Sequence, residues 1–308
     1  VNIRQAQYLI TVYEEGSISN AAKRLYISQP ALSQTIQIVE KEIGARIFNR
    51  NTTPISLTYA GEKYLATARK LIALETNLHR EIMEIRQESS GKLRVAISTL
   101  RSMALLPRIL PRFMKEYPAV ELEVVEVGST SMDDLVLTGK VDLALLLSRE
   151  KVIEDLTYVP LGRERLLLFA GPETELAKTT PPYTGITIDR AKDEKFISVH
   201  PGHGTRTTQD HMFNEYRISP RIIFETHSVE VARRLAIACN AVALFPETLL
   251  SNWMHPAGIY YPILGGQFLP ELFFCYSKNS YLPRYMADFI KITKEECFSE
   301  DRKEPAHV

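Results

Sequence analysis

The sequence predicts an α+β protein of several domains, and three observations lead to this fold class. The first 60 residues carry three short helical patterns and two short apolar runs, which is typical of a small helical unit with a hairpin. Residues 58–87 then continue a single helical pattern without a proline. The rest of the 308 residues alternates between strand and helix patterns, which favours parallel βαβ units.

The first unit is expected to begin with a helix over residues 3–15. Its apolar residues fall on one helical face, and Gly16 ends it. A second helix is expected within SISNAAKRLYI, with Ser19 as its N-cap and with Ala22 and Leu25 facing inward. These two helices would form part of a small apolar core.

A third helix is expected to start at Ser28, because serine is a favoured N-cap and Pro30 is tolerated in a first turn. Gly44 is expected to end it. The residues assigned to its buried face are Ile36, Val39 and Ile43. Residues 47–50 and 55–57 are short apolar runs separated by NTTP, which predicts a hairpin of the kind called a wing.

The long helix over residues 58–87 carries an apolar stripe along one face. The residues of this stripe are Tyr64, Ala68, Leu71, Leu78, Ile82 and Ile85, with Leu74 or Glu75 in the gap. A helix of this length needs a partner for such a stripe, and a second copy of the chain is the simplest one. Packing of the stripe on the chain's own domain is the alternative.

A polar break at residues 88–91 is interpreted as a hinge, and the pattern changes after it. Strands are expected at residues 93–98, 121–127, 141–147, 166–171, 195–199, 241–245 and 271–277. Helices are expected at residues 105–116, 132–137, 207–216, 229–238 and 281–294. A charged tail follows Glu295.

The overall charge does not point to a partner, because 37 basic residues balance 37 acidic ones. Residues 1–60 hold six Lys or Arg and four Glu, an excess of +2. The three cysteines are scattered, which fits neither a disulfide framework nor a zinc site, and they are interpreted as buried thiols. We find neither an apolar run long enough to span a bilayer nor an export leader, so a cytoplasmic protein without membrane contact is expected.

Six segments, in order and at matching spacing, resemble the LysR-type transcriptional regulators. They are GSISNAAKRLYISQPALSQTIQIVEKEIGARIFNRN, LTYAGEKYL, LLPRILPRFMKEYPAVELEV, GKVDLALL, GHGTR and CNAVALFPE. The resemblance implies a winged helix-turn-helix, a linker helix, and a two-lobed α/β effector domain like a periplasmic solute-binding protein. It also implies double-stranded DNA and a small-molecule effector as partners, a homodimer or tetramer, and RNA polymerase as a further candidate partner.

The domain boundaries expected on this basis are 1–58 for the DNA-binding domain, 59–88 for the dimerisation helix and 89–308 for the effector domain. Within the effector domain, lobe I is placed at about 92–161 and 265–294, lobe II at about 162–264, and the tail at 295–308. Two departures from the family pattern remove positive charge. Gln34 stands where the family usually carries Arg, and the wing tip at residues 51–53 is neutral.

The candidate DNA-binding residues lie at the start of the third helix and at the wing, since the N-terminal residues of a recognition helix reach base edges in the major groove. They are Ser28, Gln29, Pro30, Ala31, Ser33, Gln34 and Arg50. A glutamine can hydrogen-bond adenine at N6 and N7, and serine can bond several base edges. Arg50 is suited to a phosphate or to the minor groove.

The candidate effector-binding residues follow strand ends, where ligands bind in open α/β sheets. They are Ser98, Thr99, Arg101, Ser129, Thr130, Ser148, His203, Thr205 and Arg206. Hydroxyls and helix N-termini favour an anion, and the two arginines suit a carboxylate or a phosphate. For either arginine alone, a surface or interface charge is an equally good interpretation. His200 and His203 lack an accompanying carboxylate, so we expect no metal site.

The sequence therefore favours an effector-responsive DNA-binding regulator, with a small organic anion as the effector class. We find no phosphate loop, activated nucleophile or acid pair, so we expect neither catalytic residues nor a cofactor. The alternative is a solute receptor or enzyme-like binding protein whose N-terminal helices serve only assembly. The SQPALSQ segment and the wing discriminate between the two, because such a receptor has no need of them.

Overall fold

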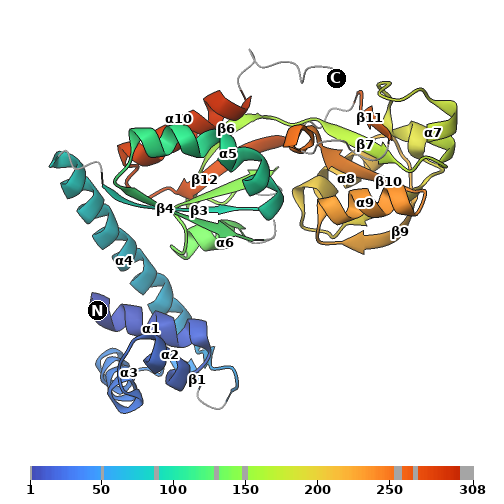
Figure 1. Ribbon diagram of the computed structural model, residues 1–308. Coiled ribbons are helices and arrows are strands. Elements are labelled where there is room, and N and C mark those ends of the chain that lie inside the picture. Colours follow the sequence, from blue (N-terminus) through green and yellow to red (C-terminus); the bar gives the residue numbers. More distant parts are fainter. Residues whose placement is uncertain are drawn as a thin grey trace. The chain divides into compact units, whose positions relative to one another are not determined.

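The computed structural model of the chain describes residues 2–49, 52–86, 90–127, 132–147, 152–252, 259–265 and 270–298. It divides into two units, Val1–Gln87 and Glu88–Val308. Figure 1 shows the first unit in blue to cyan and the second in green to red. Each unit has its own apolar core.

Three helices form the body of the first unit: α1 (Ile3–Glu15), α2 (Ile18–Arg24) and α3 (Gln29–Ile43). Each has a side-chain N-cap, which satisfies a first-turn N–H group that has no helical partner. The cap of α2 is Ser17, whose Oγ accepts from Asn20 N, so the expectation of Ser19 was wrong. Gly16 and Gly44 end α1 and α3 in the left-handed conformation, as predicted.

The wing is a short antiparallel hairpin of β1 (Phe48–Asn49) and β2 (Ser56–Leu57). Two contacts fix it to the helices. The Ile47 N–H donates to Glu40 Oε1 on α3 at 2.8 Å, and the Ile55 N–H donates to the carbonyl of Gly16 at 2.9 Å. Ile43 was expected in the core but is 39% exposed at the last position of α3, where the chain turns away at Gly44.

The long helix α4 (Tyr59–Ile85) is capped by Thr58. The apolar stripe predicted along it consists of two halves with different surroundings. Its first half packs on the core of its own unit, where Tyr64, Leu65 and Ala68 are buried. The backbone approach there is close, since a Cβ on Gly61 would lie 2.1 Å from the Ile47 carbonyl oxygen. The second half is exposed: its apolar residues are Leu74, Leu78, Ile82 and Ile85.

The second unit contains two five-stranded sheets. The strands of the first sheet are in the order β4-β3-β5-β12-β6. They are β3 (Gly91–Ile97), β4 (Val120–Glu126), β5 (Leu143–Leu147), β6 (Leu156–Arg163) and β12 (Glu271–Ser277). β3 is parallel to β4 and β5, whereas β12 is antiparallel to β5 and β6.

Three helices cover the first sheet: α5 (Thr99–Glu116), α6 (Met132–Leu137) and α10 (Arg284–Phe298). Figure 1 shows α5 and α10 on one face and α6 on the other. The two faces form separate apolar clusters, one with Phe113 and Phe289 and the other with Met132 and Cys275.

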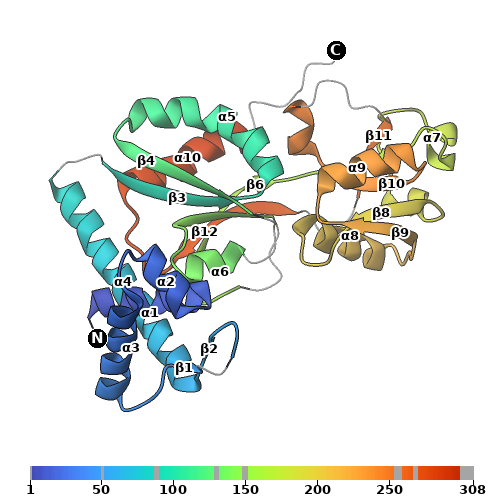
Figure 2. The same ribbon diagram turned by 60° about the horizontal axis from the view of Figure 1, so that its bottom comes forward.

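The strands of the second sheet are in the order β11-β7-β10-β8-β9. They are β7 (Leu166–Ala170), β8 (Lys195–Val199), β9 (Arg221–Thr226), β10 (Val242–Pro246) and β11 (Ile259–Pro262). The helical segments are α7 (Glu175–Thr179), η1 (Ile188–Ala191), α8 (Gly204–Glu215), α9 (Val229–Ala238) and η2 (Glu247–Asn252). Figure 2 shows α9 and α8 on opposite faces of this sheet. β8 is parallel to both neighbours, β9 and β10.

Several expectations from the sequence need correction here. The strands β6, β9 and β11 were not predicted, α8 begins at Gly204 rather than Thr207, and α10 continues to Phe298 beyond the expected start of the tail. Of the three cysteines, Cys275 is buried, Cys297 is half-buried and Cys239 is exposed. The interpretation as buried thiols therefore fails for Cys239. Within the described residues, no helix is long and apolar enough to cross a membrane.

The exposed half of the α4 stripe generates a first prediction. Leu78→Asp replaces one of the four exposed apolar residues with a carboxylate among the other three and should weaken the pairing of two copies. Burying an unpaired charge costs several kcal/mol, so the dimer dissociation constant should rise by roughly tenfold or more. Analytical ultracentrifugation across a concentration series measures this constant.

The matched control is Ala73→Asp, which adds the same charge at an exposed position on another face of α4. It should leave the dissociation constant within about a factor of two, because a solvated surface charge costs little. Equal weakening by both substitutions, or none by Leu78→Asp, would show that the stripe is not the contact between copies.

Candidate nucleic-acid interface and ligand site

The first turns of α3 present a polar, accessible surface. The Ser28 Oγ accepts from Ala31 N, which fixes the start of the helix, and Leu32, Ile36 and Val39 hold its other face in the core. Of the predicted contact residues, Ser33 is half-buried and the others described are exposed: Ser28, Gln29, Pro30, Ala31 and Gln34. Arg50 lies outside the described residues. The helix therefore leaves Gln29 and Gln34 accessible for hydrogen bonds to a partner.

Tyr26 is a candidate contact that the sequence analysis missed. It lies in the turn between α2 and α3 with φ of 54°, and it is 95% exposed. A large aromatic side chain so fully exposed next to a recognition helix is unusual, since Tyr normally buries its ring. The signal available in the sequence is an aromatic residue in the short connection between the second and third expected helices.

In the second unit, the start of α8 lies against the end of β5. A Cβ on Gly204 would lie 2.2 Å from the Leu147 carbonyl oxygen, so only glycine permits this approach. Through this contact the first turn of α8, on the second sheet, meets a strand end of the first sheet. Predicted effector residues from both sheets are thereby gathered in one region.

In two helices that start in this region, the side chain of the N-cap residue accepts no hydrogen bond from the first turn. The N-cap of α5 is Ser98 and that of α8 is His203. The other α-helices with a described N-cap, α1 to α4, α7 and α9, are all capped by a side chain. First-turn N–H groups that no side chain caps are suited to binding an anion.

Thr205 is the predicted effector residue whose placement is most informative. The residue is 5% exposed in the first turn of α8, and its hydroxyl oxygen is not among the fully buried polar atoms that lack a partner. Ser98 is half-buried and Thr99 exposed. A hydroxyl at such a position can donate a hydrogen bond to a ligand or accept one from it.

Arg101 does not offer its charge to a ligand in this structure. Its guanidinium donates two hydrogen bonds to the carboxylate of Glu164, at 3.0 and 2.6 Å. The two side chains are 8% and 0% exposed. Thr248 on η2 donates a further hydrogen bond to Glu164. The pair joins α5 to the crossover between the sheets, so Arg101 has a structural role that the sequence analysis did not foresee.

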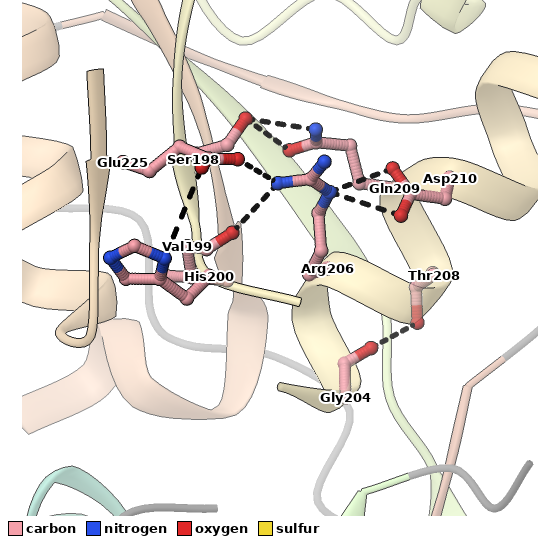
Figure 3. Close-up of polar contacts among 9 residues, drawn as sticks. All are labelled: Ser198, Val199, His200, Gly204, Arg206, Thr208, Gln209, Asp210 and Glu225. Carbon is pink, nitrogen blue, oxygen red and sulfur yellow. Dashed lines mark hydrogen bonds and ion pairs between the residues drawn. The ribbon is translucent and has the colours of Figure 1, made fainter. Parts of the chain in front are cut away.

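Arg206 is compensated as well. Figure 3 shows its guanidinium between Asp210, one turn further along α8, and Glu225 at the end of β9. Its Nε donates to the two Asp210 oxygens at 2.8 and 3.0 Å, and its Nη1 donates to the Val199 carbonyl at 3.1 Å. The Arg206 side chain is 14% exposed. Sequence analysis missed both of its acidic partners.

The start of α8 is fixed on β8 by a buried pair. Ser198 Oγ and Gln209 exchange hydrogen bonds at 2.8 and 3.0 Å, as Figure 3 shows. The remaining predicted effector residues, Ser129, Thr130 and Ser148, lie outside the described residues. Among those described, no group of three or more His, Cys, Asp or Glu is arranged to hold a metal ion.

Comparison with known proteins matches both units. The family model for the bacterial regulatory helix-turn-helix protein of the lysR family matches residues 3–62. The model for the LysR substrate binding domain matches residues 86–298. The chain is 25% identical to the HTH-type transcriptional regulator CysB of Haemophilus influenzae over 94% of this chain and 89% of that one. It is 28% identical to the uncharacterized HTH-type transcriptional regulator YcgK of Bacillus subtilis over 96% and 94%.

Solved structures show the same fold. The structure of full-length CbnR complexed with its target DNA matches with a TM-score of 0.64 and 22% identity, covering 96% of this chain and 100% of that one. An OxyR variant from Pseudomonas aeruginosa matches with a TM-score of 0.71 and 18% identity, covering 96% and 94%.

The Arg101–Glu164 pair leads to a second prediction. Arg101→Met should destabilise the second unit by about 3–5 kcal/mol, because it leaves the fully buried carboxylate of Glu164 without its cation. Replacing both residues with Met should restore most of that loss. Chemical unfolding of the full chain followed by circular dichroism measures the change.

Arg165→Met is the matched control, since the Arg165 side chain is 68% exposed and its Nε lies 3.8 Å from Glu247. An exposed pair of this kind contributes about 1 kcal/mol or less. If Arg101→Met were no more destabilising than Arg165→Met, the buried pair would not hold the crossover.

Proposed function

The chain belongs to the LysR family of bacterial regulators, and from this premise we propose how it recognises DNA and which class of effector it binds. Family membership makes it a DNA-binding transcriptional regulator whose activity a small-molecule effector modulates. The alternative of a solute receptor with N-terminal helices used only for assembly leaves the match over residues 3–62 without an explanation.

DNA recognition is assigned to the first turns of α3. The observation that carries this assignment is the exposure of Gln29 and Gln34 on a helix whose opposite face is fully buried. Such a helix fits the major groove with its N-terminal residues at the base edges. Because both side chains are neutral, we infer that they contribute to sequence discrimination rather than to general attraction for phosphate.

The effector is assigned to the region where α5 and α8 begin. The position of Thr205 in the first turn of α8 and the two N-termini without side-chain caps support a ligand that accepts hydrogen bonds. A small organic anion meets this description. Ser98 and Thr99 are the proposed contacts from the first sheet, and His203 and Thr205 those from the second.

The setting of this function is also part of the proposal. A transcriptional regulator acts on the chromosome, which places it in the cytoplasm and makes RNA polymerase a candidate partner. The exposed half of the α4 stripe supports assembly into a homodimer or a tetramer.

Gln29→Ala tests the recognition surface. It should weaken binding to the cognate operator by about 1–3 kcal/mol, the usual contribution of a good base contact, and hardly change binding to random DNA. Fluorescence anisotropy at a fixed salt concentration measures both affinities.

The control for this experiment is Gln37→Ala, an exposed glutamine two turns further along the same helix. It should leave discrimination unchanged. Equal weakening of specific and random binding by Gln29→Ala would make Gln29 a phosphate contact and contradict base readout.

Thr205→Val tests the effector site, since it keeps the shape of the side chain and removes the hydroxyl. Small carboxylates that raise the melting temperature in a thermal-shift screen serve as probes. Binding of such a probe should weaken by about 1–3 kcal/mol, because its polar group loses a partner in a buried setting. Binding of DNA without the probe should be retained.

Thr179→Val on α7 is the control, because that threonine is exposed and donates to the Glu175 carbonyl within its own helix. It should not affect the probe. Calorimetry of both variants decides the assignment, and an unchanged affinity in Thr205→Val would place the ligand elsewhere.

A further inference from the structure

Three histidines gather beside the start of α8, and no sequence motif announced them as a group. His200 follows β8, His203 is the N-cap of α8, and His227 follows β9. The rings of His200 and His227 are stacked with centroids 4.2 Å apart, and those of His203 and His227 are tilted at 5.8 Å. We call these three residues the histidine cluster.

Strand pairing brings the cluster together. β8 and β9 are parallel, with Val199 opposite Thr226, and the His200 N–H donates to the Thr226 carbonyl at 2.9 Å. The residues that follow the two strands therefore leave the sheet side by side. The turn from His200 to His203 then places the third ring near the other two.

The cluster runs from the surface inward. His227 is exposed, the His200 side chain is 38% exposed, and His203 is 6% exposed. Burial lowers the pKa of His203 below its usual value, and the neighbouring His227 and His200 lower it further. At neutral pH His203 is therefore uncharged in the absence of a ligand.

The fixed charges of the described residues around the cluster are balanced, because a net −1 beside Arg206 is offset by a net +1 on α9, where one glutamate pairs with two arginines. The positive charge of Arg206 is set against two carboxylates, Asp210 on α8 and Glu225 on β9, which leaves a net −1. His200 Nδ1 lies 3.9 Å from Glu225 Oε2. On the next element, Glu230 of α9 forms ion pairs with both Arg233 and Arg234. On the described part of the first sheet, Arg101 forms an ion pair with Glu164.

We propose that the histidine cluster supplies the positive charge of the effector site, so that the protein binds its anion together with a proton. This inference rests on the effector site proposed above. With all three imidazoles neutral, the described charges of this region leave no net positive charge to attract an anion. Each imidazole that gains a proton adds +1, so a single protonated ring already gives the region a net positive charge.

The linkage has a definite direction. An anion beside the cluster favours the charged form of an imidazole, so the bound state has the higher histidine pKa and takes up protons. Affinity for the anion must then be highest at low pH and fall as the pH rises through the range in which the bound-state imidazole titrates. Arginines as the source of charge would give an affinity independent of pH over this range.

Sulfate is the probe for the test, because its own charge does not change between about pH 6 and about pH 8, where imidazoles titrate. The full chain is labelled with carbon-13 at histidine, and its signals are followed by NMR across this range with and without sulfate at constant ionic strength. The chain has seven histidines, so those outside the cluster, such as His79 and His211, report any general salt effect.

The expected result is a higher pKa for at least one cluster histidine when sulfate is present, with no change at His79 or His211. The dissociation constant should be lower at about pH 6 than at about pH 8 by roughly fivefold or more, the linkage expected from one histidine whose pKa rises by about one unit. His203→Gln and His227→Gln should flatten this pH dependence, whereas His211→Gln on α8 should retain it.

Two outcomes would overturn the inference. One outcome is that the unsubstituted protein binds sulfate equally strongly at both pH values and that Thr205→Val abolishes this binding. The effector site then stands, and the cluster is not its source of charge. If sulfate binds at neither pH and operator binding is intact, the cluster takes no anion, while the assignment as a DNA-binding regulator is unaffected.

Discussion

The buried carboxylate of Glu164 is the constraint on which the arrangement of the second unit depends. It lies where the chain leaves β6 in the first sheet for β7 in the second, and its side chain is 0% exposed. An ionised carboxylate in such a place is tolerated only with close partners. Arg101 from α5 and Thr248 from η2 provide them. A helix that covers the first sheet and a segment that follows a strand of the second sheet are therefore held at the same crossover.

Compensation of charge by nearby carboxylates also decides what the sensing region can recognise. Arginine is always protonated, so Arg101 and Arg206 carry full charges, but each lies against at least one carboxylate. A ligand would have to displace those carboxylates to use either guanidinium fully. Histidine differs because its charge depends on its surroundings, and a ligand can therefore bring that charge about. This contrast is why the histidine cluster matters more for an anion than the arginines that stand out in the sequence.

The sequence predicts the elements with strong local patterns and fails where distant residues define them. α6, β8, α9 and β12 have the bounds expected from periodicity. β6 carries Pro160 and is a strand because β12, far along the chain, pairs with it. The same limit applies to the candidate site. Ser98, His203 and Thr205 could be proposed from the sequence because they come after expected strands. Glu164 and Glu225, in contrast, lie 63 and 19 residues from the arginines whose charge they compensate. No periodicity or motif relates residues at such separations.

The contact between Gly204 and Leu147 explains how a ligand at this site can act on the second unit. At this point the two sheets meet through backbone atoms, with no side chain at Gly204 to separate them. Thr205, a buried residue that we propose as a contact of the effector, is the next residue. A ligand shifts an equilibrium only if it binds one arrangement better than another. One that contacted both the start of α8 and the start of α5, as we propose, would favour the arrangement in which the two sheets meet. The proposed site therefore lies beside the backbone contact between the two sheets, where a ligand that prefers one packing of the sheets would favour that packing.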